Sequence, residues 1–190
     1  WRKSKVNLID TPGDSNFLAD TPATLRVVDG VVIVISAVDG IEFCTEKVWN
    51  WATEQAIPKI IFINKADHEQ ADIKAVLESI KRKFKVNPFS VQTVVGTGEK
   101  FTTVIDVLSK RLHTYQMDRS GKNKSDIIPE GMIEEVNFSF AELTELVAEV
   151  DDELTENYLE NGELSEKEFD SGFKKGLKEG KLLPVFLGSA

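Results

Sequence analysis

Residues 31–37 read Val-Val-Ile-Val-Ile-Ser-Ala, an almost unbroken β-branched run that is typical of a central parallel strand covered on both faces. A second apolar run, Lys59–Asn64, predicts another buried strand. A helix is expected over residues 42–56, between the two strands, and Pro58 ends it. Apolar residues on one face predict another helix over residues 69–85. This alternation of strand and helix indicates βαβ units, so the sequence predicts an α/β fold with a mostly parallel sheet.

Two further segments precede this unit. Residues 6–10 predict a buried strand, and residues 17–28 carry apolar side chains at helical spacing. Pro22 interrupts the helical pattern, because proline removes a backbone donor and clashes with the preceding turn. We therefore expect a fresh helix start there, with Asp20 or Thr21 as its cap.

The pattern changes after Asn87-Pro88 to short alternating segments, which predict a small antiparallel sheet. Its strands are expected at residues 89–95, 102–107 and 111–115, followed by a polar loop at 118–129. One long helix is predicted over residues 134–159, and a capping box formed by Ser165 and Glu168 begins a last helix. A strand over residues 182–187 then returns the chain to the first sheet. The predicted parts are residues 1–87, an inserted α+β subdomain at 88–181, and a return strand and loop at 182–190.

The charge is unevenly distributed along the 190 residues, whose net charge is −9. Residues 129–180 hold 16 acidic and 4 basic side chains, a net charge of −12, which leaves the rest near +3. This balance disfavours bulk electrostatic binding of nucleic acid, and we expect no direct sequence-specific contact with it. A partner with a basic surface is expected instead.

The composition also bears on location and on metal binding. No stretch approaches the apolar length of a membrane span, so we expect no membrane partner. The single cysteine, Cys44, cannot form an internal disulfide, which predicts a cytoplasmic protein. With only His68 and His113 beside it in the sequence, Cys44 gives no metal-ligand cluster.

The first candidate site is Asp10-Thr11-Pro12-Gly13-Asp14, directly after the predicted strand at 6–10. A carboxylate at the carboxyl end of a strand, followed by a glycine that lets a ligand approach the backbone, suits a metal and a phosphate. Asp10 is expected to hold Mg²⁺ through water, and the Gly13 N–H to face a terminal phosphate. A plain turn is the alternative, because this composition also favours turns.

The second candidate site is Asn64-Lys65-Ala66-Asp67, at the carboxyl end of the predicted strand Lys59–Asn64. Guanine presents adjacent N1–H and N2–H₂ donors, and the Asp67 carboxylate could accept both, whereas adenine offers no such pair. Asn64 would tie the loop to neighbouring backbone, and the Lys65 stem would lie over the base face. A capped turn between strand and helix is the alternative.

The third candidate site is Gly188-Ser189-Ala190, after the predicted return strand. Small residues here would let a backbone N–H reach a carbonyl oxygen of the base. Alone this pattern says little. The three sites support one another because each follows a strand, and parallel sheets bind ligands at the carboxyl ends of their strands.

The order of these motifs resembles the GTP-binding domain of translational GTPases, and most of all bacterial elongation factor G. The resemblance covers essentially all 190 residues. It implies a partial G domain of the P-loop GTPase fold, into which residues 88–181 are inserted. The motifs that carry it are Asp10-Thr11-Pro12-Gly13, Arg26-Val27-Val28-Asp29-Gly30, Ala37-Val38-Asp39-Gly40, Thr45-Glu46-Lys47-Val48-Trp49, Asn64-Lys65-Ala66-Asp67 and Pro184-Val185-Phe186-Leu187-Gly188-Ser189-Ala190.

The resemblance also implies ligands, partners and residue roles. The ligands are GTP or GDP with Mg²⁺, and the activity is GTP hydrolysis on the ribosome that drives movement of tRNA and mRNA. The inserted subdomain would meet the ribosomal stalk protein. Asp10 and Gly13 would belong to switch II, and the guanine pocket would comprise Asn64, Lys65, Asp67, Ser189 and Ala190.

The chain departs from the family in lacking a G-x-x-x-x-G-K-[ST] phosphate loop. It begins at Trp1 without an initiator Met and stops directly after a predicted strand, so we expect it to be a piece of a longer protein. The phosphate loop and switch I are then expected before Trp1. On this interpretation the 190 residues alone bind GTP feebly and are inactive as an enzyme.

A second departure is Asp14, which stands where the family usually has the His that positions the attacking water. Aspartate is negatively charged at neutral pH. At about 4 Å from phosphate oxygens, the repulsion between the two negative charges is about 4 kcal/mol at an effective dielectric constant of about 20. The cost corresponds to about a thousandfold in rate. Asp14 is therefore expected either to point away from the phosphate or to mark a slow or specialised hydrolase.

Two other functions compete with this interpretation. The chain could be a module that docks on the ribosome or its stalk while its nucleotide site is weak or decayed, as Asp14 would allow. The intact Asn64-Lys65-Ala66-Asp67 argues against complete decay. A dinucleotide-binding enzyme is disfavoured, because no G-x-G-x-x-G opens a helix after a strand.

Overall fold

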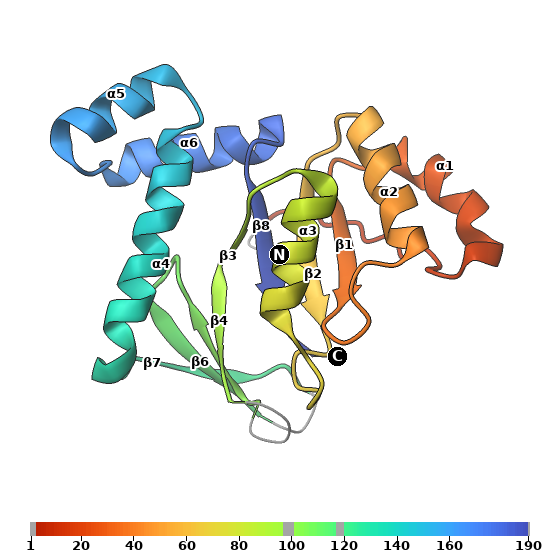
Figure 1. Cartoon of the computed structure of the whole chain (residues 1–190), viewed down its shortest axis with the longest axis horizontal. Helices are drawn as coiled ribbons and strands as arrows, with labels where there is room; N and C mark the ends of the chain where they lie inside the picture. Colours follow the sequence, from red (N-terminus) through yellow and green to blue (C-terminus); the bar gives the residue numbers. More distant parts are fainter. Residues whose placement is uncertain (1–2, 97–100, 117–119, 190) are drawn as a thin grey trace.

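The computed structural model describes residues 3–96, 101–116 and 120–189. Its first sheet has the strand order β1-β2-β8-β3, and all neighbouring strands are parallel (Figure 1). The predicted α/β class with a mostly parallel sheet is therefore confirmed. The return strand β8 lies between β2 and β3, as expected for a chain that comes back to its first sheet. The strands are β1 (Val31–Ser36), β2 (Lys59–Asn64), β3 (Pro88–Ser90) and β8 (Leu183–Leu187).

Two helices, α2 (Phe43–Glu54) and α3 (Ile73–Phe84), cover one face of this sheet (Figure 1). Trp49 of α2 stacks on Phe84 of α3 with ring centroids 4.1 Å apart. The buried core beneath them combines strand and helix side chains, among them Ile33, Ile35, Ile61, Ile63, Val76, Ile80 and Val185.

The prediction that residues 31–37 form a central strand covered on both faces is wrong. β1 is the edge strand of its sheet. The side chains of its alternate residues Val32 and Val34 are 54% and 57% exposed. A run of β-branched residues specifies a strand, but the number of neighbours that cover it depends on other segments.

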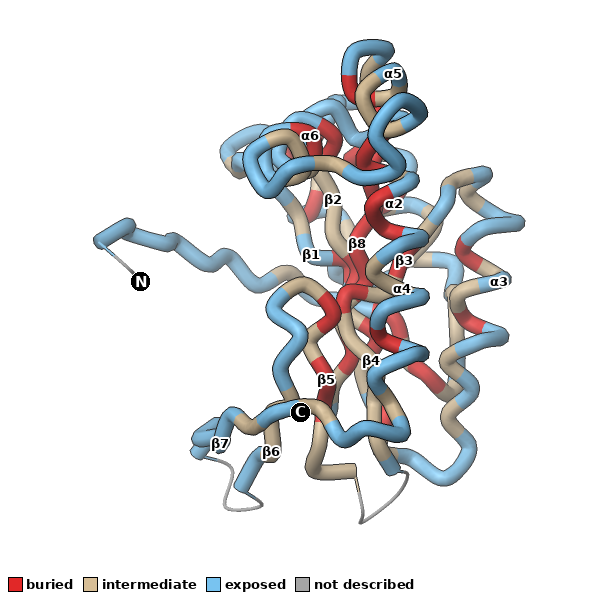
Figure 2. Tube along the Cα trace, turned by 90° about the vertical axis from the view of Figure 1, so that its left-hand side faces the viewer, coloured by how far each residue is buried: buried red, intermediate tan, exposed pale blue. Residues whose placement is uncertain are grey.

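The strand predicted at residues 6–10 is also absent from the structure, where this segment is extended but unpaired. Val6 and Leu8 are 69% and 87% exposed, and Figure 2 shows the N-terminal segment standing out from the body. A strand requires a neighbour for its backbone hydrogen bonds, and no described residue provides one here. The fresh helix start at Pro22 is confirmed: a 3₁₀ helix, η1 (Ser15–Asp20), gives way to α1 (Thr21–Leu25), with Asp20 in the cap position.

The second sheet is antiparallel, with the strand order β4-β5-β6-β7. The strand predicted over 89–95 is divided: its first part, β3, joins the parallel sheet, and its second part, β4, begins the antiparallel one. Hydrogen bonds from Val91 N to Val185 O (3.0 Å) and from Leu187 N to Gln92 Oε1 (3.0 Å) hold the two sheets together. The strands are β4 (Gln92–Val95), β5 (Thr103–Asp106), β6 (Arg111–Tyr115) and β7 (Asn123–Asp126), of which β7 lies in the predicted loop.

Three helices, α4 (Glu130–Ala148), α5 (Asp152–Asn161) and α6 (Glu166–Glu179), complete the chain before β8. The single helix predicted over 134–159 is broken, because the Asp151 carboxylate accepts from Leu154 N (3.0 Å) and caps a new helix. The predicted capping box of Ser165 and Glu168 is confirmed. None of the described helices is long and apolar enough to cross a membrane.

Replacing Gly172 of α6 by Ala is expected to destabilise the chain by about 1–2 kcal/mol. A Cβ there would lie 2.6 Å from Leu154 Cδ1 and 2.8 Å from Val147 Cγ1. Overpacking of this kind costs about 1–3 kcal/mol, which exceeds the gain of up to about 1 kcal/mol from helix propensity. Urea denaturation measures the change in the free energy of unfolding.

Gly131 of α4 is the matched control for this prediction, because a Cβ there would meet nothing within 4 Å. Gly131→Ala should leave the stability unchanged or raise it by up to about 1 kcal/mol. A Gly172→Ala variant as stable as wild type would contradict the close helix packing seen here.

Candidate functional site

The carboxyl ends of β2 and β8 bring two of the three predicted site loops together. Ala66 N donates a hydrogen bond to Gly188 O (3.0 Å), and Gly188 N donates to Ile63 O (3.0 Å). Asn64, Lys65 and Asp67 therefore lie beside Gly188 and Ser189 at one edge of the parallel sheet. Ala190, the last predicted site residue, lies outside the described residues.

Gly188 packs closely against the neighbouring strand β2. A Cβ at this position would lie 2.7 Å from Phe62 Cζ on the neighbouring strand β2. A larger residue would therefore have to displace the Phe62 ring. Here the small residue serves the packing between loop and strand.

Lys65 has a left-handed backbone conformation, with φ of 60°, and its side chain reaches back toward the end of β1. Its Nζ lies 3.2 Å from Asp39 Oδ2. The Ser36 hydroxyl donates to the same oxygen at 2.7 Å. These hydrogen bonds, first from Ser36 and then from Lys65, lower the pKa of Asp39 below its ordinary value.

Sequence reasoning did not assign a role to Asp39. It appeared only within Ala37-Val38-Asp39-Gly40, one of the motifs that carry the resemblance. The signal that could have found it is topological: Asp39 follows β1, Lys65 follows β2, and these two strands are parallel neighbours. Side chains after the carboxyl ends of such strands lie close together.

Asp10, Gly13 and Asp14 lie apart from these loops, on the exposed N-terminal segment. In the described part of the chain, Asp10 and Gly13 form no hydrogen bond or ion pair with either loop. The Asp14 carboxylate accepts from both the backbone N and the side-chain Nδ2 of Asn16, each at 2.8 Å. It thereby caps η1.

The sequence matches the elongation factor Tu GTP binding domain family over residues 1–190. The chain belongs to this family. Among solved structures, its fold is similar to a crystal structure of a protein from Thermus thermophilus, with a TM-score of 0.83 and 26% sequence identity. That match covers 95% of this chain and 26% of the Thermus protein, so the chain spans about a quarter of that protein's length.

The loops after β2 and β8 lie side by side at the carboxyl ends of two neighbouring parallel strands. The half-buried Asp67 supplies a carboxylate at the edge where parallel sheets hold ligands. Within residues 3–96, 101–116 and 120–189, no three His, Cys, Asp or Glu side chains are grouped to hold a metal ion. Asp10 supplies a single exposed carboxylate, and Mg²⁺ usually takes one or two carboxylates and completes its shell with water and substrate phosphates.

Proposed function

We propose that this chain is part of the GTP-binding and GTP-hydrolysing domain of a cytoplasmic translation elongation factor G-like protein that acts on the ribosome in translocation. The observation that carries the proposal is the pairing of Ala66 with Gly188, which joins the Asn64–Asp67 and Gly188–Ser189 loops in a chain of this family. We assign residues 1–87 and 182–190 to the G domain and residues 88–181 to an inserted subdomain.

The residues at this edge suit guanine better than adenine. The Asp67 carboxylate is to accept the N1–H and N2–H₂ donors of the base, with Asn64 and Lys65 beside it. Backbone N–H groups of Ser189 and Ala190 would donate to the carbonyl oxygen of the guanine base. Asp10 is to hold Mg²⁺ through water, and the Gly13 N–H is to face the terminal phosphate. When bound, Mg²⁺ neutralises charge on the phosphates.

Nucleotide binding by two forms of the protein tests this proposal. The full-length protein should bind GDP and GTP, with ATP far weaker. The 190-residue chain should show no micromolar binding of GTP in calorimetry, because its sequence contains no G-x-x-x-x-G-K-[ST] phosphate loop. A full-length protein that binds ATP as well as GTP, or neither, would overturn the proposal. Micromolar GTP binding by the chain alone would refute the expectation that binding needs such a loop.

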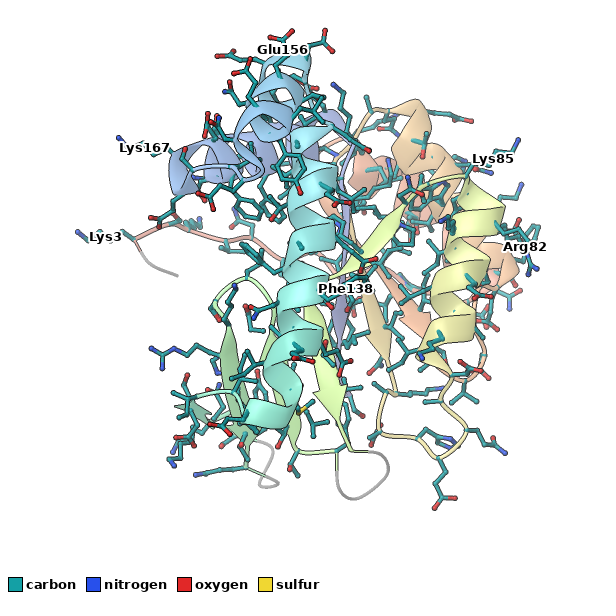
Figure 3. All side chains as sticks on the ribbon, turned by 60° about the vertical axis from the view of Figure 1, so that its left-hand side comes forward. Lys3, Arg82, Lys85, Phe138, Glu156 and Lys167 are labelled. Carbon is teal, nitrogen blue, oxygen red and sulfur yellow. The ribbon has the colours of Figure 1, made fainter. Side chains whose placement is uncertain are left out.

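We further propose that the acidic surface of α4 binds the ribosomal stalk protein. Its five glutamates, Glu130, Glu134, Glu135, Glu142 and Glu145, are exposed, and none forms an ion pair within the described residues. Phe138, on the middle of α4 (Figure 3), is 66% exposed. Since residues three and four apart share a helix face, Phe138 lies among Glu134, Glu135 and Glu142. An apolar anchor within uncompensated acidic charge suits a basic partner.

Replacing Phe138 by Ser is expected to weaken binding of the stalk protein about tenfold, since removing an apolar anchor costs more than about 1 kcal/mol. Calorimetry with the purified stalk protein and the 190-residue chain measures the change. Glu163→Gln is the matched control, because Glu163 is exposed and acidic but lies beyond α5. Equal affinities for Phe138→Ser and wild type would contradict docking through α4.

The second candidate function is a ribosome- or stalk-docking module with a weak or decayed nucleotide site. The observation that favours it is Asp14, whose carboxylate caps η1 through Asn16. Under this alternative the stalk protein binds as described, while the full-length protein neither holds GDP firmly nor hydrolyses GTP on ribosomes. The nucleotide-binding experiment therefore separates the two functions.

A further inference from the structure

The ion pair between Asp39 and Lys65 joins the loop after β1 to the loop after β2. Lys65 Nζ lies 3.2 Å from Asp39 Oδ2, and the two side chains are 51% and 55% exposed for Asp39 and Lys65 respectively. The pair spans 26 positions of sequence, and its lysine belongs to the loop that carries Asp67. No function described so far uses Asp39.

The loop that carries Asp39 is held by its own hydrogen bonds. The backbone N–H groups of Val38 and Asp39 donate to Ser36 Oγ at 3.2 and 3.1 Å, and Gly40 N donates to Ser36 O at 2.9 Å. The Ser36 hydroxyl in turn donates to the Asp39 carboxylate at 2.7 Å. The carboxylate is thus fixed by a compact turn at the end of β1.

The backbone of Lys65 is fixed as well. Its φ of 60° lies in the left-handed region, and the next residue is bound to the β8 loop through Ala66 N and Gly188 O. The long lysine side chain keeps its rotamer freedom even when the backbone is fixed, and it loses this freedom when it is ordered. An anchor at its ammonium group restricts the whole stem.

We propose that Asp39 is a positioning residue, which holds the Lys65 side chain in the place where its stem forms one wall of the guanine pocket. The inference rests on the proposed function, because it takes the Asn64–Asp67 loop as a guanine site. Asp39 does not touch the base in this arrangement. It lowers the cost of ordering Lys65 when the nucleotide binds, which is the general benefit of preorganisation.

The expected effect is small, because the pair is half exposed. Ion pairs of this kind contribute little in water, so loss of Asp39 should weaken GDP binding about two- to fivefold. Salt screens the attraction between exposed charges. The effect of Asp39 should therefore shrink as the salt concentration rises toward about 1 M, whereas a purely structural role would not respond to salt in this way.

The test is a double-mutant cycle in the full-length protein, with displacement of a fluorescent GDP analogue as the measurement. Asp39→Asn, Lys65→Met and the double variant are compared at low and high salt, with thermal unfolding to show that each is folded. Glu69→Gln is the matched control, because it removes an exposed carboxylate from the same region without touching Lys65. We expect Asp39→Asn to weaken binding about two- to fivefold in the wild-type background and to have no effect beside Lys65→Met.

The outcomes separate this inference from the proposed function. A wild-type protein that fails to bind GDP would overturn the guanine site itself and the inference with it. A wild-type protein that binds GDP, with Asp39→Asn indistinguishable from Glu69→Gln, would overturn only the inference. An undiminished effect of Asp39→Asn in the Lys65→Met background would also overturn it, because Asp39 would then act through another group.

Discussion

Asp67→Asn is expected to weaken GDP binding to the full-length protein by about a hundredfold or more. The Asp67 carboxylate is to accept two hydrogen bonds from guanine, and bonds to a charged group contribute about 1.5–3 kcal/mol each. An amide at this position can present one oxygen, but its NH₂ group then faces a guanine donor. Losing both charge-assisted bonds costs about 3–6 kcal/mol, or about two to four orders of magnitude in affinity. Displacement of a fluorescent GDP analogue measures the change.

Xanthosine diphosphate supplies the complementary measurement for Asp67. Xanthine carries a carbonyl oxygen where guanine carries its amino group, so the NH₂ group of Asn can donate where the carboxylate would repel. The Asp67→Asn variant should therefore bind xanthosine diphosphate more tightly than GDP, while wild type should prefer GDP. If the affinity of the variant falls equally for both nucleotides, the substitution has disrupted the fold of the loop. If it retains GDP, Asp67 does not read the base.

The strands that could be predicted from sequence are those with a continuous run of apolar side chains. β2 occupies residues Lys59–Asn64 as predicted, because its Ile and Phe residues need cover on both faces. β7 was missed because its sequence, Asn-Lys-Ser-Asp, has three exposed residues of four and no apolar pattern. It exists through backbone pairing with β6, which sequence periodicity does not detect.

The segment at residues 6–10 illustrates the opposite error. Its Val6, Leu8 and Ile9 have the side chains of a buried strand, yet these are exposed in the structure. Side chains indicate that a segment favours a strand, but strand formation also requires a partner for its N–H and C=O groups. Within the described residues, β1 has a strand neighbour on one side only, and residues 6–10 do not pair with its other side. The apolar pattern at 6–10 was therefore not sufficient to predict a strand.

The candidate site was predictable in part for a related reason. That Asn64–Asp67 and Gly188–Ser189 both follow parallel strands could be inferred from sequence, and their proximity follows from the topology. The hydrogen bond that joins them, from Ala66 N to Gly188 O, could not be inferred from the residue types alone, because it depends on the backbone geometry of both loops. The ion pair of Asp39 with Lys65, 26 positions away in sequence, required the pairing of β1 with β2 to be known as well.

Asp14→His in the full-length protein is expected to raise ribosome-stimulated GTP turnover by up to about a thousandfold. Under the proposed function Asp14 follows the residues that face magnesium and the terminal phosphate. Removing a negative charge at about 4 Å from phosphate oxygens should lower the activation free energy by about 4 kcal/mol at an effective dielectric constant of about 20. That energy corresponds to about three orders of magnitude in rate. Release of inorganic phosphate in the presence of ribosomes measures it.

Asp14→Asn distinguishes charge from water positioning, because an Asn oxygen can still accept the hydrogen bond from Asn16 N that caps η1. If charge alone slows the reaction, the Asn variant should match the gain of the His variant. If the family's His is needed to orient water, only Asp14→His should be fast. Unchanged turnover in both variants would contradict the prediction, and the carboxylate would then act on η1 through Asn16 and not on the phosphate. Both variants remove the same charge. The ratio of their GTP turnover rates therefore measures what the imidazole itself contributes.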